Sequence, residues 1–365
     1  MTNIDNLLLN TAINGLKVLE ADNGFMLGGH NGPYSDPETS VRNTSHWLLI
    51  FAKAYELSKD QTFLEAVSQC ANYLLLESNF PYGYTYYCRD KKGKDKCNGL
   101  IGQAWVIEAL AKSHSLLEDP RYIERAIECF NLHPQQDDTG LWERVEITGE
   151  KLGLDYTFNH QLWFCMAGAL IMSHSDEVEK KVRGFLENFN KNLVLRGNGR
   201  IGHQIYLDFY RSKIKPIIRA LIRKGWKADN IEKEIGYHAF NTYALSVIKN
   251  QMPEHALWKS ADVIRLIDYL ASNEYVNNIS SSKYGFPYNP PGIEVAYTFQ
   301  VFSDMPNKMT KSVVDNLLIK QFVEGFDVNG NMMNKNGTKD RLTHAARIYE
   351  ATRLSEEFYN LDIPL

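Results

Sequence analysis

Two kinds of helix alternate along the 365-residue chain, and this alternation limits the possible folds more than any other feature. One kind is amphipathic, as in residues 61–76, where Phe63, Val67 and Leu74 share one face. The other kind is apolar nearly all round, as in residues 46–57. Because a helix without a polar face must be buried on every side, the apolar helices need the amphipathic ones to cover them.

The apolar helices recur at a nearly constant distance. They begin near His46, Gln103, His160, His238, Glu294 and His344, at spacings of 57, 57, 78, 56 and 50 residues. The amphipathic helices cover residues 4–19, 61–77, 120–130, 176–190, 253–270 and 310–323. Six buried helices inside six amphipathic ones predict an all-α (α/α)6 toroid, a closed double ring with little β-structure. We expect a single toroid domain over residues 1–365, with an insertion at about 196–235.

Long connections precede the apolar helices, whereas the connections that follow them are short. The long ones are rich in Gly, Tyr and Asn and cover residues 80–98, 133–159, 191–236 and 277–292. In a closed ring they would gather at one end, and function concentrates in such loops. We therefore expect the site at the N-terminal turns of the inner helices, where free N–H groups and the helix dipole favour an anionic ligand.

Polar and aromatic residues recur at these N-terminal turns. We expect substrate binding by Arg42, His46, Trp47, Gln103, Trp163, Glu294, Tyr297, His344 and Arg347. Four of the ten histidines, at 46, 160, 238 and 344, occupy equivalent positions of the repeat. Each alone could be a helix cap or a satisfied core group, but a shared wall of titratable groups is costly to bury without use.

Composition excludes several classes of function. With 40 basic and 44 acidic residues and a formal charge of −4, a nucleic-acid partner is not expected. The longest uncharged apolar run, near residues 161–175, is shorter than the roughly 20 residues that a bilayer requires, so no integral membrane segment is expected. The first residues show no signal-peptide pattern and the five cysteines are scattered, which together predict a cytoplasmic protein with reduced thiols.

The remaining composition favours a saccharide ligand. Twenty Tyr, 17 Phe and 6 Trp provide rings that can stack on sugars or fill a thick core. Residues 211–227 hold seven basic residues and no acid, which predicts a basic flap that steers an acidic chain, a solvated helix face or a membrane-surface helix. Neither a metal nor a cofactor is expected, since metal-ligand spacings and a phosphate-binding loop are both missing from the sequence. The oligomeric state is left open.

Two segments resemble polysaccharide lyases. Residues 158–163, Phe-Asn-His-Gln-Leu-Trp, are similar to the Asn-Asn-His-x-x-Trp segment of alginate lyases, with Phe158 in place of the first Asn. Residues 237–245, beginning Tyr-His-Ala-Phe, resemble a segment of toroidal lyases that include the heparinase-like group. In those families Asn neutralises the uronate carboxylate, while His and Tyr handle the C5 proton and the leaving oxygen. The resemblance implies the catalytic residues Asn159, His160, Tyr237 and His238.

Other segments resemble the N-acylglucosamine 2-epimerase superfamily. They are His344-Ala-Ala-Arg347 on the last inner helix, residues 291–297 (Pro-Gly-Ile-Glu-Val-Ala-Tyr) and the stretch from Arg42 to Trp47. That family uses two histidines as acid and base, one of them near the Pro-Gly segment, where this chain has none. Both resemblances imply the toroid and a sugar substrate.

From these observations we predict an enzyme for an acidic, uronate-containing oligo- or polysaccharide that acts by C5 proton abstraction and β-elimination. One alternative is a glycoside hydrolase that pairs Glu294 with Asp155 or Glu143. A second alternative is a sugar epimerase of the N-acylglucosamine 2-epimerase type. A third is a non-enzymatic glycan-binding scaffold, for which the six helix starts would not converge and the funnel would be plugged by side chains.

Overall fold

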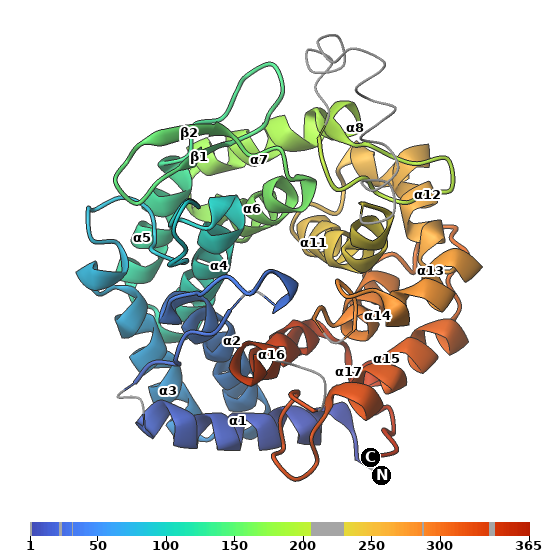
Figure 1. Ribbon diagram of the computed structural model, residues 1–365, viewed down its shortest axis with the longest axis horizontal. Coiled ribbons are helices and arrows are strands. Elements are labelled where there is room, and N and C mark those ends of the chain that lie inside the picture. The colour runs from blue at the N-terminus through green and yellow to red at the C-terminus, as the bar shows by residue number, and fades with distance from the viewer. Residues whose placement is uncertain (1, 22–23, 31, 206–229, 287, 336–339) are drawn as a thin grey trace.

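A computed structural model describes residues 2–21, 24–30, 32–205, 230–286, 288–335 and 340–365, and it confirms the predicted (α/α)6 toroid. The inner ring consists of α2 (Ser40–Ser58), α4 (Gly99–Leu117), α6 (Phe158–Ile171), α11 (His238–Gln251), α14 (Pro291–Val301) and α16 (Arg341–Ala346). The outer ring consists of α1 (Ile4–Ala21), α3 (Gln61–Leu74), α5 (Pro120–Asn131), α7 (Asp176–Glu187), α12 (Ala261–Tyr269) and α15 (Lys311–Gly325). Figure 1 looks down the axis of the two rings.

Shorter elements complete the chain. The sixth inner helix continues as the 3-10 helix η6 (Arg347–Arg353), and the remaining short α-helices are α8 (Phe189–Asn192), α13 (Asn273–Asn278) and α17 (Glu356–Tyr359). The other 3-10 turns are η1 (Gly32–Tyr34), η2 (Glu77–Asn79), η3 (Met172–His174), η4 (Ala256–Lys259) and η5 (Ile279–Ser281). Strands β1 (Glu143–Val145) and β2 (Lys151–Leu154) pair antiparallel within the loop before α6.

Burial follows the two helix types. In α6 every side chain from Leu162 to Ala167 is 0% exposed, so the helix is covered all round. In the outer helix α5, Tyr122, Ala126 and Cys129 are buried on one face, while Glu124 and Glu128 are exposed on the other. The inner helices therefore form the core, and the outer helices shield it with one face each.

Four of the six inner helices begin differently from the outer helices, whereas the inner helices α2 and α16 are capped by the side chains of Thr39 and Asp340. Outer helices start at residues whose side chains accept a hydrogen bond from their own first turn, such as Asp60 for α3, Asp119 for α5 and Ser175 for α7. Side-chain caps of this kind are not formed by the residues that precede α4, α6, α11 and α14. The N–H groups of these inner helices therefore need partners from other segments or from a ligand.

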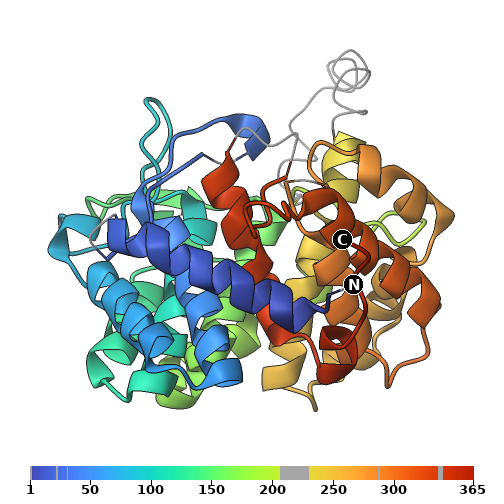
Figure 2. The ribbon, with the colours of Figure 1, turned by 90° about the horizontal axis from the view of Figure 1, so that it is seen from below.

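Two glutamines in the inner ring anchor the long loops. Gln103 of α4 accepts from the Tyr86 N–H at 2.7 Å and donates to the Cys97 carbonyl at 2.7 Å, so it clamps the loop over residues 80–98. Gln161 of α6 contacts both backbone polar groups of Trp142 in the same way, at 2.9 and 2.8 Å. As predicted, the described parts of the long loops rise from one end of the ring (Figure 2).

The ends of the chain meet and close the ring. Thr2 and Ile363 exchange backbone hydrogen bonds of 3.3 and 2.8 Å, and both termini lie beside α1 (Figures 1 and 2). The five cysteines are buried and unbridged. A search of the described helices finds none with the length and apolarity needed to cross a bilayer. The predicted basic flap at 211–227 lies outside the described residues.

Candidate functional site

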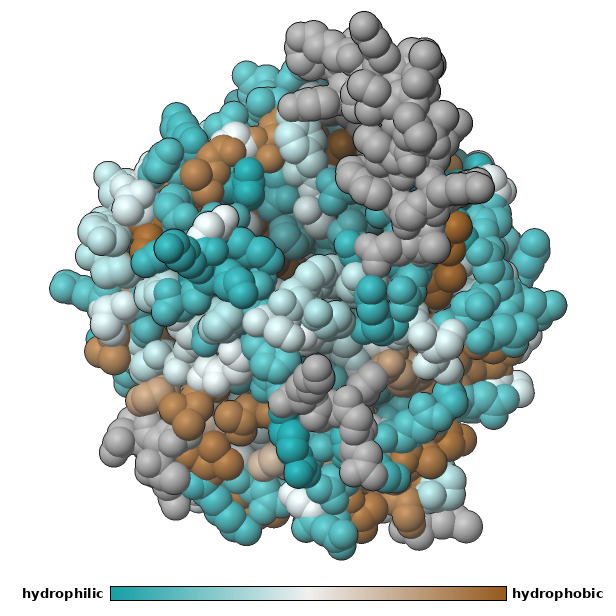
Figure 3. Space-filling model, viewed as in Figure 1, coloured by the Kyte–Doolittle hydropathy of each residue, from teal (hydrophilic) through white to brown (hydrophobic). Residues whose placement is uncertain are grey.

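A cavity of about 210 Å³ opens at the end of the ring where the inner helices begin. Residues at or near the starts of five inner helices line it, and Arg347, which follows α16, represents the sixth. Its walls include Arg42, Asn98, Ile101, Trp105, Asn159, His160, Tyr237, Phe240, Tyr288, Asn289 and Arg347. Figure 3 views this end of the molecule and shows mostly hydrophilic residues around the hollow. The scaffold alternative required the helix starts to diverge and the funnel to be filled, and neither condition is met.

Arg42 is buried in the cavity wall with unused hydrogen-bonding capacity. The residue is 2% exposed, and its guanidinium donates from Nη1 to Glu38 at 2.8 Å and lies 4.2 Å above the Trp105 ring. Its Nε and Nη2 atoms have no hydrogen-bond partner among the described residues. Since a buried charged donor without an acceptor is costly, these N–H groups are suited to an anionic ligand.

Arg347 adds a second buried cation, supported from below by two carboxylates. It donates to Glu294 at 3.4 Å and also to Glu350, and both carboxylates are 0% exposed. Burial raises the pKa of Glu294 and of Glu350, because one guanidinium cannot neutralise two carboxylates in a dry interior. Glu294 therefore holds Arg347 in place beneath the cavity.

His160 and Asp155 form a dyad at the start of α6. The Nδ1 atom of His160 lies 2.8 Å from Asp155 Oδ2. Burial by itself would raise the pKa of Asp155, but the His160 imidazole, the Thr157 N–H and the Arg144 charge together lower it to about 2. Asp155 is thus an anion that fixes the orientation of the imidazole, and the His160 side chain remains 26% exposed on the cavity wall.

Tyr237 and Asn159 present polar groups to the same cavity. The Tyr237 hydroxyl donates to the Tyr34 hydroxyl at 3.4 Å, and its ring stacks on His203 with the centroids 5.3 Å apart. Burial, with the neighbouring Tyr288 and Tyr34 hydroxyls, raises the pKa of Tyr237 well above its ordinary value, so the phenol keeps its proton at neutral pH. Asn159 is 4% exposed, and its Oδ1 has no partner among the described residues.

Other residues predicted for the site lie beneath the cavity or behind its wall. His46 is fully buried between the rings of Tyr349 and Trp105, at centroid distances of 4.2 and 5.3 Å. Burial, with the charges of Arg42 and Arg347, lowers the pKa of His46 well below its ordinary value. His344 lies behind Tyr288, and burial, with Arg347, lowers its pKa to about 4.

His238 is not brought to the cavity surface. Its Nδ1 accepts from the Ile201 N–H at 3.2 Å, and its Nε2 lies 2.8 Å from the Leu266 carbonyl. Burial lowers its pKa to about 4. Both ring nitrogens are therefore engaged with the backbone, so the histidine joins the loop before α11 to the outer helix α12.

Four further predicted binding residues do not line the cavity, because packing or loop support occupies them. Trp47 packs against Gly15 of α1, and Trp163 stacks on Phe240 at 4.2 Å. The Tyr297 hydroxyl accepts from Asn250 at 2.8 Å, and Gln103 holds its loop as described above. The carboxylates of the hydrolase alternative, Glu294, Asp155 and Glu143, also do not line it.

The structure adds cavity residues that the sequence did not single out. They are Tyr34, Asp36, Glu38, Arg89, Lys94, Asn98, Ile101, Trp105, Thr157, His203, Phe240, Tyr288 and Asn289. Most come from loops, and periodicity carries no information about where a loop side chain points. The density of Tyr and Lys in residues 82–96 was the available signal for this part of the wall.

Comparison with known proteins places the chain in a family. It is 38% identical to archaeal glycosylation protein Q of Haloferax volcanii over 377 aligned residues, which cover 99% of this chain and 100% of that protein. The chain belongs to the family of this protein. Protein-family models give no match to it.

Several solved structures share the fold of this chain, although their sequences have low identity to it. Cellobiose 2-epimerase from Bacillus thermoamylovorans has a TM-score of 0.63 at 11% identity, covering 90% of this chain and 92% of that one. D-mannose isomerase has a TM-score of 0.64 at 14% identity, covering 95% and 96%. An unsaturated glucuronyl hydrolase specific for heparin has a TM-score of 0.62 at 10% identity, covering 98% and 99%. At sequence identities of 10–14%, the structural similarity establishes the toroid fold alone.

Proposed function

We propose that the cavity is the active site of a carbohydrate enzyme that removes the C5 proton of a uronate residue in an acidic oligo- or polysaccharide and eliminates the substituent at C4. The observation that carries the proposal is the presence, in one cavity, of a buried guanidinium with unpaired donors and a carboxylate-oriented histidine. The related glycosylation protein and the saccharide enzymes that share the fold support a sugar substrate.

Arg42 binds the uronate carboxylate in this proposal. Two free N–H groups of one guanidinium match the two oxygens of a carboxylate, and Asn159 adds a side-chain amide from the start of α6. When the C5 proton leaves, negative charge moves onto the carboxylate oxygens. Donors already held in a buried wall stabilise that charge without reorganisation, which lowers the barrier.

His160 takes the proton, and Tyr237 supplies one. Asp155 holds the Nδ1 side of the imidazole, so Nε2 is the base that accepts the C5 proton. The electron pair of the C5–H bond forms the C4–C5 double bond, and the C4–O4 bond breaks. The departing O4 takes the phenolic proton of Tyr237, a group that the burial described above keeps protonated.

A C5 epimerase is the second candidate, since it shares the first step. His160 belongs to the inner helix α6, and Tyr237 lies in the turn before the inner helix α11. Both line the cavity, so a proton removed at one wall could be returned from another. Hydrolysis by the predicted carboxylate pair is less well supported, because Asp155 is engaged with His160 and Glu294 with Arg347.

Two readouts test the proposal. The protein is incubated in D2O with a panel of uronate oligosaccharides. NMR follows deuterium at C5, and ultraviolet absorbance follows the unsaturated uronate. Elimination yields the absorbance, epimerisation yields deuterium at C5 without it, and His160→Ala should lower either rate by roughly 10²–10⁴-fold. His174→Ala, at the exposed turn η3, is the control. Reducing-end release with neither signal, or full activity in His160→Ala, would refute the proposal.

A further inference from the structure

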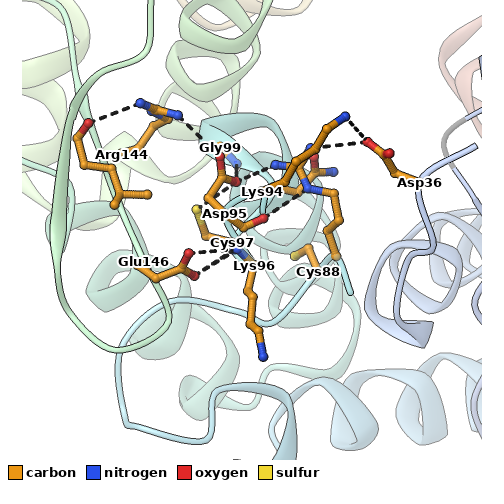
Figure 4. A network of polar contacts seen from close by, with 12 residues as sticks. Asp36, Cys88, Lys94, Asp95, Lys96, Cys97, Gly99, Arg144 and Glu146 are labelled. Carbon is orange, nitrogen blue, oxygen red and sulfur yellow. Dashed lines mark hydrogen bonds and ion pairs between the residues drawn. The ribbon is translucent and has the colours of Figure 1, made fainter. Parts of the chain in front are cut away.

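We infer that the mouth of the cavity holds a second anion-binding subsite, formed by Arg89, Lys91 and Lys94, which takes a phosphate or carboxylate group next to the reacting uronate. The inference rests on the proposed function, because it assigns a substrate with two anionic groups to the same cavity. It concerns the loop before α4, which the mechanism above does not use (Figure 4).

Positive charge lines the cavity at two depths. Arg42 and Arg347 have side chains 1% and 6% exposed, whereas Arg89 and Lys94 have side chains 12% and 43% exposed. All four residues line the same cavity. The first pair therefore belongs to its floor and the second pair to its mouth.

The cations at the mouth outnumber their acidic partners. The Asp36 carboxylate is shared by Arg89 and Lys91, each at 3.9 Å, and by Lys94 at 2.5 Å. Arg89 also contacts Asp95 at 2.7 Å, and Asp95 is shared in turn with Arg144 at 3.3 Å. Four cations, of which Arg89 and Lys94 line the cavity, thus share two carboxylates, so the cluster carries an excess of positive charge.

Neighbouring acidic groups are engaged elsewhere: the Glu38 carboxylate, which also lines the cavity, pairs with Arg42 at 2.8 Å. Glu146 uses its carboxylate on the backbone N–H groups of Lys96 and Cys97, and within residues 89–96 five basic residues accompany two acidic ones. Lys233 also lies close to Tyr34: its Nζ is 5.9 Å from the centre of the Tyr34 ring, and the Nζ of Lys94 is 6.0 Å from it. Cations from two segments therefore converge on one aromatic residue of the mouth.

The loop that carries these cations is held firmly at its base. Cys88 and Arg89 both donate their N–H groups to the Lys96 carbonyl, at 2.9 and 3.0 Å, and Asp95 accepts from the Gly99 N–H at 2.9 Å. Figure 4 shows Asp95, Lys96 and Glu146 at the centre of this network. A fixed cluster of like charges beside a cavity adds little to stability, but it attracts and orients an anionic ligand.

Calorimetric titration with three probes tests the subsite: D-glucuronate, glucuronate 1-phosphate and digalacturonate. Glucuronate 1-phosphate and digalacturonate each carry a second anionic group. In the wild type we expect both of them, or the one whose second group fits, to bind about tenfold more tightly than glucuronate. This gain in affinity should become smaller as the salt concentration rises. The double variant Lys91→Gln/Lys94→Gln should lose most of this gain and keep its affinity for glucuronate. Lys320→Gln/Lys311→Gln on the outer helix α15 is the control.

The outcomes separate the two proposals. A gain for the phosphate alone or for the disaccharide alone identifies the second group, and either result supports the subsite. Equal affinity for all three probes, or a gain that survives in the double variant, overturns the subsite and leaves the proposed function intact. Failure of every probe to bind, glucuronate included, overturns the proposed function and the subsite with it.

Discussion

The contact between Asp155 and His160 can be tested by changing Asp155 to asparagine, which keeps the shape of the side chain and removes its charge. Asp155 also accepts hydrogen bonds from the Thr157 N–H at 3.1 Å and the Leu100 N–H at 3.4 Å. The carboxylate therefore joins the starts of α4 and α6 to the imidazole. Its loss should affect both stability and catalysis.

The pKa of Asp155 sets the expected loss of stability. A fall from the ordinary value of 3.8 to about 2 corresponds to about 2.4 kcal/mol of unfolding free energy at neutral pH. Because the pKa is depressed in the folded state, this stabilisation is present above pH 4 and is lost as the pH falls toward 2. At pH 3 about half of it remains, since the folded carboxylate is still largely ionised there while the unfolded one is largely protonated.

Urea unfolding of the wild type and Asp155→Asn at pH 7, 4 and 3 measures this effect. We expect a difference of about 2 kcal/mol at pH 7 that narrows to about 1 kcal/mol at pH 3. Asp138→Asn, an exposed carboxylate in a turn, is the control for loss of charge alone. A pH-independent difference, or one equal to that of the control, would show that Asp155 is not a stabilised anion. Proton exchange at C5 should fall as well, since His160 loses the group that orients it.

Three further outcomes follow from the packing. Tyr237→Phe should lower the elimination rate about 10²-fold or more while leaving the urea midpoint nearly unchanged; wild-type turnover would remove the phenol from the mechanism. His46→Phe should stabilise the fold, and this stabilisation should be about 2 kcal/mol larger at pH 5 than at pH 8, because only the unfolded chain protonates His46. A stabilisation that does not change with pH would contradict the burial of His46 as a neutral group. Gly292→Ala should cost about 1–3 kcal/mol, since its Cβ would lie 2.3 Å from the Leu317 carbonyl oxygen between α14 and α15, and an unchanged urea midpoint would contradict that contact.

The helical repeat was sufficient to predict the fold and the location of the cavity. A helix such as α6, with no polar face, has to be enclosed, and its spacing of 57 residues from α4 implies a ring of equal units. Since long loops precede each inner helix, the loops meet at one end. Arg42, Asn159, His160, Tyr237 and Arg347 are found there as predicted.

The repeat could not distinguish a side chain in the cavity from one behind its wall. The spacing pairs residue 103 with residue 160, but in the structure Gln161 is the residue that clamps a loop as Gln103 does, while His160 faces the cavity. Side chains on every face of an inner helix are buried against other segments of the protein. Their apolar pattern in the sequence therefore does not indicate which face is turned toward the cavity. His238 illustrates this, since its two ring nitrogens contact backbone groups from separate segments.

The sequence by itself determined the double ring and the end at which polar residues collect, because both depend on periodicity along the chain. Only the tertiary structure decided the pairings between distant segments. Asp155 became the partner of His160, Glu294 the support of Arg347, and Asp36 the shared anion of the mouth. The physical reason is that hydrogen bonds and ion pairs act over a few ångströms in space, and loop geometry, which periodicity does not encode, sets those distances.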